Sequence, residues 1–199
     1  MKIGIFGGTF NPIHIGHAII ARCVLEKSDL DQLWFMVTPL NPFKEESPAQ
    51  VTDRDRLLMT QMVARRIPGC STSAFEFGLP RPSYSVNTLR ALREKFPQHE
   101  FSLIIGADNW VAFNRWKEPE DIIQHHRVMV YPRLGCDIEV PPSLTGRVTA
   151  IDAPIIEISS TLVRQRVAAG LDVSFFLPDD VLQYVNRNHL YQPSSLSSQ

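Results

Sequence analysis

Short apolar runs alternate along this chain with longer segments in which apolar residues recur at every third or fourth position. The runs of strand length are 2–6, 32–37, 101–106, 127–131 and 147–151. The segments with helical spacing are 17–27, 52–69, 85–96 and 118–126. Because strand and helix alternate, the strands are expected to pair in parallel through right-handed crossovers. The pattern therefore predicts an α/β fold, a Rossmann-like doubly wound parallel sheet with helices on both faces.

The chain is expected to fold as a single domain. Its 199 residues, 44% of them hydrophobic, supply enough apolar material for one core and little for two. Residues 1–191 carry the alternating pattern, whereas the tail 192–199 has too few apolar residues to pack and is expected to be disordered. Within the domain, Thr52 is placed to cap the helical segment 52–69 and Gly69 is placed to end it.

Charge and cysteine content exclude several classes of function. The formal net charge is −1 and the sequence pI is about 6.6, so no basic surface is expected for a nucleic-acid polymer or an anionic membrane. No run approaches the ~20 apolar residues that span a bilayer, and the first residues indicate a strand rather than a signal peptide. Cys23, Cys70 and Cys136 are odd in number and widely spaced, which favours a reducing compartment. The expected location is cytoplasmic.

The stretch GGTFNPIHIGH, residues 7–17, stands where the first strand gives way to a helix. Gly7 and Gly8 allow close backbone approach, and a helix N-terminus offers unpaired N–H groups to a phosphate. The spacing matches neither the dinucleotide-binding G-x-G-x-x-G nor the P-loop. His14 and His17 are three apart, so both imidazoles are expected to share a face and donate to phosphoryl oxygens. A metal site is not predicted, because no third ligand is near, and ordinary surface or core histidines are the alternative.

Two further segments offer cations to such a phosphate. Residues 41–50, NPFKEESPAQ, have the composition of an exposed loop that closes over a site, and Lys44 is its candidate ligand-binding residue. The stretch ISSTLVRQRVAAG, residues 158–170, places hydroxyls ahead of a second helix. Arg164 follows Thr161 by three residues, so it shares that face and presents a planar fork. Taken alone, this stretch is better explained as an ordinary capped helix with a solvent-facing arginine.

Together the two stretches resemble the paired signatures of the nucleotidyltransferase superfamily that transfers adenylyl and cytidylyl groups. GGTFNPIHIGH is similar to its T/HIGH motif, and ISSTLVRQRVAAG is similar to its ISSTxxR motif, in the right order and about 140 residues apart. Within the superfamily the chain resembles the bacterial nicotinate-nucleotide adenylyltransferase family over residues 1–191. The intervening marks of this resemblance are NPFK, PSYSVNTL, IIGADN, Trp116 and YPRLG.

The resemblance implies transfer of AMP from ATP to nicotinate mononucleotide, which yields deamido-NAD and pyrophosphate. The attacking phosphate oxygen is ionised at neutral pH, so the reaction needs in-line positioning and charge neutralisation rather than a general base. His17 is then expected at the α-phosphate and His14 at the triphosphate, with Mg²⁺ carried on the phosphates of ATP. The implied catalytic residues are His14, His17, Lys44 and Arg164. The implied ATP-binding residues are Gly7, Gly8, Thr9, Phe10, Gly106, Asp108, Ser159, Ser160 and Thr161.

The resemblance also implies a site for the acceptor nucleotide. Its pyridine ring needs an aromatic face, from Trp116 or Trp110, and its carboxylate needs N–H donors such as those of the helix start at Tyr84 and Ser85. Without the resemblance, each tryptophan would be assigned to packing and Asp108 to a loop cap. The implied acceptor-binding residues are Tyr84, Ser85, Asn109, Trp116 and Arg133. The chain departs from the family at Asn87, where an acid is frequent, and at Phe43, where a histidine is frequent; both departures concern the acceptor more than the phosphates.

Other functions are compatible with the same motifs. In two alternatives the enzyme transfers AMP to a different acceptor, nicotinamide mononucleotide or phosphopantetheine, and uses the same phosphate-binding residues. In a third, the fold is a nucleotide sensor without catalysis, against which the intact His14, His17, Thr161 and Arg164 argue. An RNA-binding role lacks the basic surface that it requires. The sequence leaves the oligomeric state open between a monomer and a homodimer.

Overall fold

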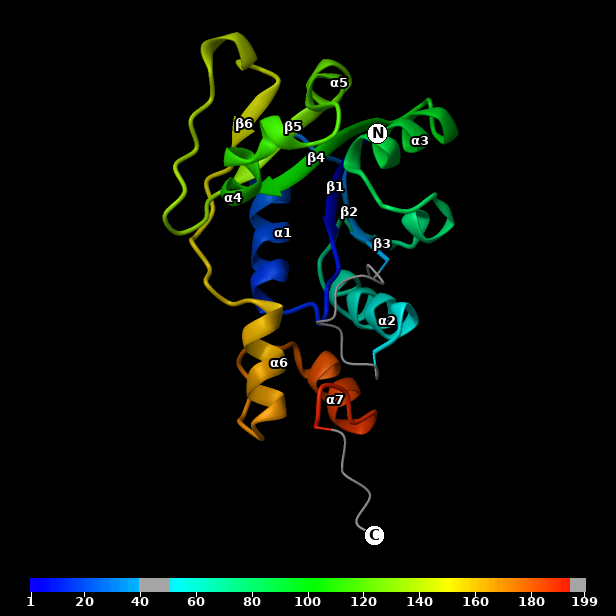
Figure 1. Ribbon diagram of the computed structural model, residues 1–199, viewed down its shortest axis with the longest axis vertical. Coiled ribbons are helices and arrows are strands. Elements are labelled where there is room, and N and C mark those ends of the chain that lie inside the picture. The colour runs from blue at the N-terminus through cyan, green and yellow to red at the C-terminus, as the bar shows by residue number, and fades with distance from the viewer. Residues whose placement is uncertain (40–50, 194–199) are drawn as a thin grey trace.

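The protein, seen in a computed structural model that describes residues 1–39 and 51–193, is built on one six-stranded parallel sheet (Figure 1). The order of the strands across the sheet is β3-β2-β1-β4-β5-β6. Their bounds are β1 Lys2–Gly8, β2 Gln32–Val37, β3 Cys70–Ser73, β4 Glu100–Gly106, β5 Arg127–Tyr131 and β6 Val148–Ala150. This order and the parallel pairing confirm the predicted doubly wound α/β fold.

Helices cover both faces of the sheet, as the sequence predicts. One face packs against α1 (Ile15–Lys27) and α2 (Asp53–Ala64), and apolar residues of α6 (Ser160–Ala168) and α7 (Asp179–Arg187) join the same core. The other face packs against α3 (Ser85–Lys95), α4 (Ala107–Val111) and α5 (Pro119–His125). Short 3₁₀ helices lie at Phe75–Gly78, Phe113–Arg115 and Pro142–Leu144. Side chains alternate along β1: Ile3 and Ile5 pack on the face covered by α3, α4 and α5, and Phe6 packs on the face covered by α1 and α2. Both faces of this strand are therefore apolar.

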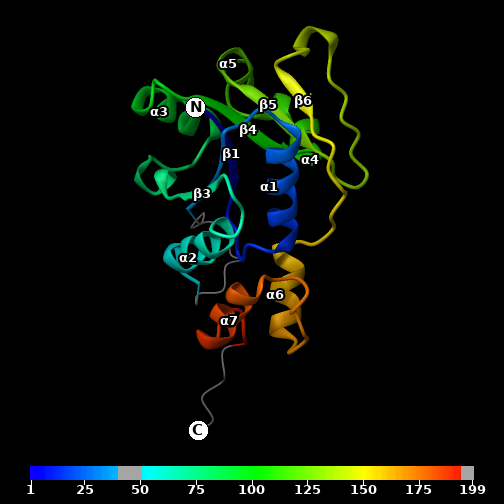
Figure 2. The same cartoon turned by 180° about the vertical axis from the view of Figure 1, so that it is seen from behind.

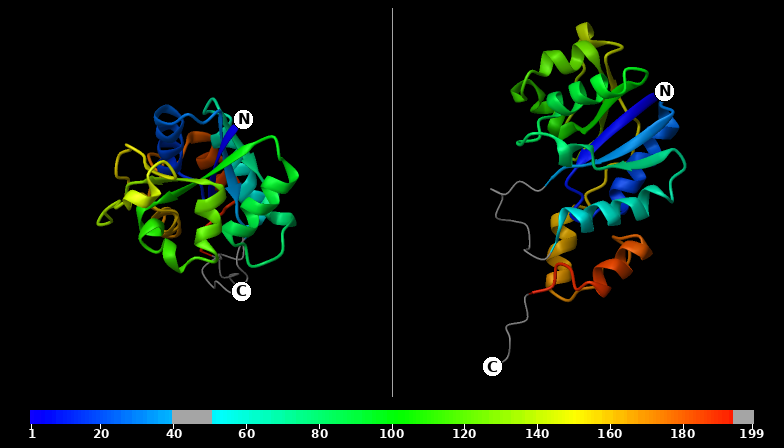
Figure 3. Two further views of the ribbon diagram at one scale, coloured as in Figure 1. Left: turned by 90° about the horizontal axis from the view of Figure 1, so that it is seen from above. Right: turned by 90° about the vertical axis from the view of Figure 1, so that its right-hand side faces the viewer.

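Helices α6 and α7 lie beyond the carboxyl end of β1, at the end of the molecule where α1 begins. The front, back and side views all show this arrangement (Figures 1, 2 and 3). This edge is also where the strand order reverses, between β1 and β4. In open parallel sheets, ligands bind outside the carboxyl ends of the strands at such a reversal. The functional residues of this chain are therefore sought in the segments that follow β1 and β4.

Several local predictions are corrected by the structure. Gly7 and Gly8 lie within β1 and not after it, because their backbones continue the ladder opposite Met36 and Val37 of β2. Helix α2 ends at Ala64, well before Gly69, whose φ of +85° instead serves the turn into β3. The sequence did not predict β3 or α7. Strand β3 is short and polar, CSTS, so it lacks the apolar run that identified the other strands.

No helix in the described part of the chain is both long and apolar enough to cross a bilayer. The predicted loop 41–50 and its Lys44 and Phe43 lie outside the described residues, as does most of the predicted tail, 194–199.

Candidate functional site at the carboxyl ends of β1 and β4

The segment after β1 turns sharply around a buried aromatic ring. Phe10 has a φ of +46°, a left-handed conformation, and its side chain is 2% exposed. The ring packs edge-on against Phe35 and His17, at centroid distances of 5.5 and 5.0 Å. A Cβ on Gly8 would lie 3.0 Å from the Phe10 ring, so glycine is needed for the ring to pack there. Phe10, expected to bind ATP, thus lies in the core beneath the loop, where it supports an imidazole.

His14 and His17 lie against each other at the start of α1, as their spacing predicts. Their ring centroids are 3.7 Å apart and their planes are inclined by 31°. His14 is the extended N-cap residue rather than part of the helix, and its backbone N–H donates to Nδ1 of His17 over 3.2 Å. A Cβ on Gly16 would lie 3.0 Å from Nδ1 of His14. The missing side chain of Gly16 therefore leaves room for the His14 ring.

Burial keeps both imidazoles neutral at physiological pH. It lowers the pKa of His14 from its ordinary value of 6.5 to about 4, with a smaller contribution from the nearby Arg133 guanidinium. The pKa of His17 lies well below its ordinary value because of burial, followed by the effects of His14 and Arg133. Since Nδ1 of His17 accepts a hydrogen bond, its proton is assigned to Nε2. His17 therefore presents an N–H donor without being charged.

The stability of the fold should fall as pH drops, in part because of His14. Above 6.5 neither state binds a proton at this ring; between 6.5 and about 4 only the unfolded chain does, so acid favours unfolding. We expect the contribution of His14 to cost about 2–3 kcal/mol of unfolding free energy between neutral pH and pH ~4. Urea unfolding of the wild type and His14→Gln at several pH values measures it. Parallel pH curves for the two proteins would contradict the assignment.

The second motif packs directly on the loop of the first. Among the predicted hydroxyls, that of Ser159 caps α6 by accepting the Leu162 N–H over 3.1 Å. The Ser160 hydroxyl donates to the carbonyl of Pro12 over 2.8 Å, and Nη1 of Arg164 donates to the carbonyl of Asn11 over 2.9 Å. These contacts join segments about 150 residues apart in sequence. They place the N-terminus of α6 at the loop that leads into α1.

Arg164 lies on the same face of α6 as Thr161, as the sequence predicts. Its Nη2 donates to the hydroxyl of Thr161 over 3.3 Å, three residues earlier on α6. The side chain is half-buried, and Thr161 is exposed. Arg164 therefore uses one nitrogen to hold the loop, while the Thr161 hydroxyl beside it is open to a ligand.

Arg133 lies beside the histidines. It lines a pocket that is formed by Phe6, His14, Gly16, His17, Ile20, Tyr131, Pro132, Arg133, Ile156 and Ile158. Its guanidinium lies over the Tyr131 ring at 5.2 Å, and its Nε is 3.7 Å from Oδ1 of Asp108. Although Arg133 was grouped with the acceptor-binding residues, the predicted site residues near it are Asp108, His14 and His17, which were assigned to ATP. Its role stays a prediction.

Gly106 and Asp108 complete that side of the site. Gly106 ends β4 and is the N-cap of α4, and a Cβ there would overlap the Asp108 carboxylate and lie 3.1 Å from Nε of Arg133. Asp108 and Asn109 are both exposed, in the first turn of α4. Nδ2 of Asn109 lies 3.4 Å from Oδ2 of Asp108. The carboxylate therefore stays accessible at the edge where β4 ends.

Tyr84, Ser85 and Trp116, three of the predicted acceptor residues, lie on the other face of the sheet, whereas Arg133 lies beside the histidines. Tyr84 is the N-cap of α3 and Ser85 its first residue, as predicted, and Nζ of Lys117 lies 5.0 Å from the centroid of the exposed Tyr84 ring. Trp116, adjacent to Lys117 in sequence, packs on Phe113 at 5.3 Å. The start of α3 and the segment of Trp116 are thus neighbours in space.

Trp110 is the less suitable platform of the two tryptophans. It also packs on Phe113, at 5.2 Å, but its indole N–H donates to the carbonyl of Glu139 over 2.9 Å. Trp116 has no such side-chain hydrogen bond among the described contacts. The sequence left the choice between these tryptophans open, and this difference favours Trp116.

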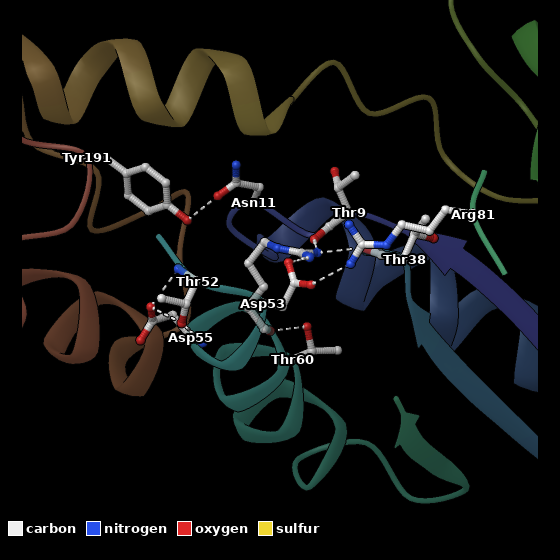
Figure 4. Close-up of polar contacts among 10 residues, drawn as sticks. Thr9, Asn11, Thr38, Thr52, Asp53, Asp55, Thr60, Arg81 and Tyr191 are labelled. Atoms are coloured by element: carbon white, nitrogen blue, oxygen red, sulfur yellow. Dashed lines mark hydrogen bonds and ion pairs between the residues drawn. The ribbon is translucent and has the colours of Figure 1, made fainter. Parts of the chain in front are cut away.

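Two residues that the sequence analysis did not single out hold the first loop. The hydroxyl of Tyr191, 3% exposed, donates to Oδ1 of Asn11 over 2.7 Å (Figure 4). Arg56 of α2, 0% exposed, donates to the carbonyls of Thr9 and Thr38. These hydrogen bonds join residues that are distant in sequence, and the two that Arg56 donates are accepted by backbone carbonyls. A single sequence carries no signal for such pairs.

Within residues 1–39 and 51–193, no three His, Cys, Asp or Glu side chains gather in a way that could hold a metal ion. The magnesium ion predicted to accompany ATP is not tested by that finding, because its ligands would include phosphate oxygens.

Comparison with known proteins agrees with the motifs. A family model described as cytidylyltransferase-like matches residues 5–166. A relative from Bacteroides fragilis, named probable nicotinate-nucleotide adenylyltransferase, is 47% identical over 88% of this chain and 87% of its own. A relative of the same name from Flavobacterium johnsoniae is 44% identical over 96% of this chain and 100% of its own.

Among solved structures, the Plasmodium falciparum nicotinic acid mononucleotide adenylyltransferase complexed with NaAD has a TM-score of 0.78. The match covers 96% of this chain and 97% of that one, at 17% identity. The same enzyme complexed with APC has a TM-score of 0.75, at 16% identity. At such low identity these likenesses concern the fold alone.

Proposed function

The chain belongs to the cytidylyltransferase-like family and, within it, to the nicotinate-nucleotide adenylyltransferases, and we propose that it transfers AMP from ATP to nicotinate mononucleotide in NAD biosynthesis. The products are deamido-NAD and pyrophosphate. One observation carries the proposal most directly. Two neutral histidines with adjacent rings lie at the start of α1, on the loop to which the Ser160 hydroxyl and Arg164 of α6 donate hydrogen bonds.

The reaction is a displacement at the α-phosphorus of ATP. An ionised oxygen of the acceptor's phosphate forms the new P–O bond, and the bond to the β-phosphate bridging oxygen breaks, which releases pyrophosphate. No proton has to be removed from the nucleophile, so a general base is unnecessary. The requirement is to hold the reactants in line and to stabilise charge on the α-phosphate and the leaving group.

The neutral histidines suit this requirement. The Nε2–H of His17 donates to an α-phosphate oxygen, while the ring of His14, 3.7 Å from that of His17, is assigned to the triphosphate. The N-terminus of α1 adds a partial positive charge, and its Ile15 and His17 N–H groups already donate to the carbonyls of Phe176 and His14, over 2.9 and 3.0 Å. Because the imidazoles stay neutral across physiological pH, their donors do not titrate away in the working range.

The β- and γ-phosphates are assigned to the start of α6. Thr161 offers an exposed hydroxyl, Ser160 a backbone N–H near the helix start, and Arg164 its guanidinium. Lys44, outside the described residues, is proposed to join them. Mg²⁺ bound to the phosphate oxygens would neutralise part of their charge, and the exposed carboxylate of Asp108 is the nearby protein oxygen that fits such an ion or a ribose hydroxyl.

The acceptor is assigned to the start of α3. The N–H groups of its first turn, beginning at Ser85, carry the partial positive charge that suits the nicotinate carboxylate. Lys117, 5.0 Å from the Tyr84 ring, adds a full charge on the same side. Trp116 offers its ring to the pyridine. An acid is therefore favoured over an amide at this position.

The proposal is tested by pyrophosphate release with ATP and Mg²⁺, using nicotinate mononucleotide, nicotinamide mononucleotide and phosphopantetheine at equal concentrations. Strong preference for nicotinate mononucleotide is expected. Its carboxylate carries the negative charge that α3 and Lys117 attract, whereas the amide of nicotinamide mononucleotide is neutral. Preference for either other acceptor would keep adenylyl transfer and overturn the assigned acceptor. ATP binding without turnover on any acceptor would indicate a nucleotide sensor.

A further inference from the structure

Arg56 is a fully buried arginine at the carboxyl edge of the sheet. It lies in the first turn and a half of α2, and its side chain is 0% exposed. Nη1 donates to the carbonyl of Thr9 and, over 2.8 Å, to the carbonyl of Thr38. Nη2 donates to Oδ1 of Asp53 over 2.6 Å. The three residues that accept these bonds, Thr9, Thr38 and Asp53, are labelled in Figure 4. One guanidinium thus joins the segment after β1, the segment after β2 and the start of α2.

Stability of the fold does not by itself explain why a guanidinium is buried here. Removing a guanidinium from water carries a large desolvation cost, and its ion-pair partner, the carboxylate of Asp53, is itself 32% exposed. Nε of Arg56 is buried without a hydrogen-bond partner in the described part of the chain. Apolar side chains of similar volume commonly stabilise a core as well as a buried ion pair does. The feature that only the planar fork supplies is a fixed geometry between two carbonyls.

The carbonyls that Arg56 holds belong to the frame of the phosphate site. Thr9 directly precedes Phe10, the left-handed residue whose ring contacts the His17 imidazole at 5.0 Å. The Thr38 N–H donates to the carbonyl of Gly8 over 2.9 Å, so the ends of β1 and β2 are already paired. Arg56 closes this pairing from the other side, because it binds Thr9 and Thr38 together.

Helix α2 is itself well fixed where Arg56 leaves it. The Thr52 hydroxyl and backbone N–H both donate to Asp55, and the Asp55 N–H donates back to Thr52 over 3.1 Å. The Tyr184 hydroxyl of α7 donates to the same carboxylate over 2.7 Å. The guanidinium is therefore presented by a capped and anchored helix end.

We propose that Arg56 is a positioning residue for adenylyl transfer, which sets the backbone at Thr9 and, through Phe10, the placement of the His17 imidazole. This inference rests on the proposed function. Arg56 makes no contact with the reacting atoms in this scheme. It determines whether the His17 donor lies in line with the α-phosphate, a placement to which the transition state is more sensitive than substrate binding is.

The test compares Arg56→Lys and Arg56→Met with the wild type and with Arg54→Met. Arg54 is an exposed arginine two residues earlier on α2, so it controls for loss of a positive charge from this helix. Each protein is assayed well below its own melting temperature, after circular dichroism has shown that it is folded. The measurements are kcat, the KM of ATP and of the acceptor, and the Kd of a non-hydrolysable ATP analogue.

We expect Arg56→Lys to lower kcat by about 10²-fold with little change in either KM or in the analogue Kd, because a misplaced donor weakens the transition state most. An ammonium keeps the charge but cannot serve both carbonyls and Asp53 in the same plane. Arg56→Met should lose at least as much, and Arg54→Met should resemble the wild type.

A folded Arg56→Lys protein with wild-type kcat would overturn the inference, as would a loss of kcat that follows the fraction of unfolded protein. Equal losses in Arg54→Met would also overturn it, because they would indicate a general effect of charge. Failure of the proposed function is separately visible: the wild type itself would then not turn over with nicotinate mononucleotide.

Discussion

Replacement of His17 by alanine is expected to lower kcat by about 10²–10³-fold, with the protein still folded. The imidazole donates from Nε2 to charge that grows on the α-phosphate, and removing one such preorganised donor typically costs about 3–4 kcal/mol of transition-state stabilisation. The KM of ATP should change much less, since the triphosphate keeps its other partners. Steady-state pyrophosphate release measures both quantities.

Two further variants make this result specific. His17→Gln places an amide N–H close to where the Nε2–H was, so it should recover part of the lost rate. His125→Ala removes an exposed histidine of α5 that contacts Asp121, away from the site, and should leave the rate unchanged. A His17→Ala enzyme with a near-normal rate would exclude His17 from catalysis. Equal rates for the Ala and Gln variants would exclude a role for its donor.

The fold could be predicted because its elements differ in periodicity. Strands such as 101–106 are continuous apolar runs, since both of their faces are covered by helices. Strand β3 was missed for the opposite reason: at the edge of the sheet it is short and half-exposed, so its CSTS sequence has no need of such a run. Secondary structure at an edge leaves a weaker signal than secondary structure in the core.

The candidate site was predictable where its geometry is local. The three-residue spacing of His14 and His17 brought the rings together, and the spacing of Thr161 and Arg164 put both on one face of α6. Contacts between segments were not predictable in this way. Arg56, three residues after Asp53 near a helix start, has the pattern of an exposed ion pair, yet it is buried against carbonyls that any residue could provide.

The placement of Arg133 illustrates the same limit. Its motif, YPRLG, identified Arg133 as functional, but the place of its side chain in the fold depends on the turn that follows β5. That turn directs the guanidinium toward Asp108 and toward His14 and His17, and its charge lowers the pKa of both histidines. The resemblance assigned Arg133 to the acceptor, whereas its neighbours in the structure include Asp108 and the histidines, which were assigned to ATP.

Replacement of Arg164 should lower kcat/KM by about 10²–10³-fold, and the effect should be concentrated on the pyrophosphate end of ATP. Arg164 is held by the carbonyl of Asn11 and the hydroxyl of Thr161 at the start of α6, where the β- and γ-phosphates are assigned. Arg164→Lys keeps the charge but loses the planar fork, so it should recover only part of what Arg164→Met loses.

The reverse reaction separates this role from a general weakening of the loop. With deamido-NAD and pyrophosphate as substrates, Arg164→Lys should raise the KM of pyrophosphate while the KM of deamido-NAD stays close to that of the wild type, because the guanidinium faces only the phosphates that leave as pyrophosphate. Arg166→Met is the matched control, since Arg166 lies on the same helix and donates instead to the carbonyl of Asp172, at 2.9 and 3.1 Å. Equal increases in both KM values would instead mean that Arg164 acts through the Asn11 carbonyl, as part of the scaffold beneath the histidines.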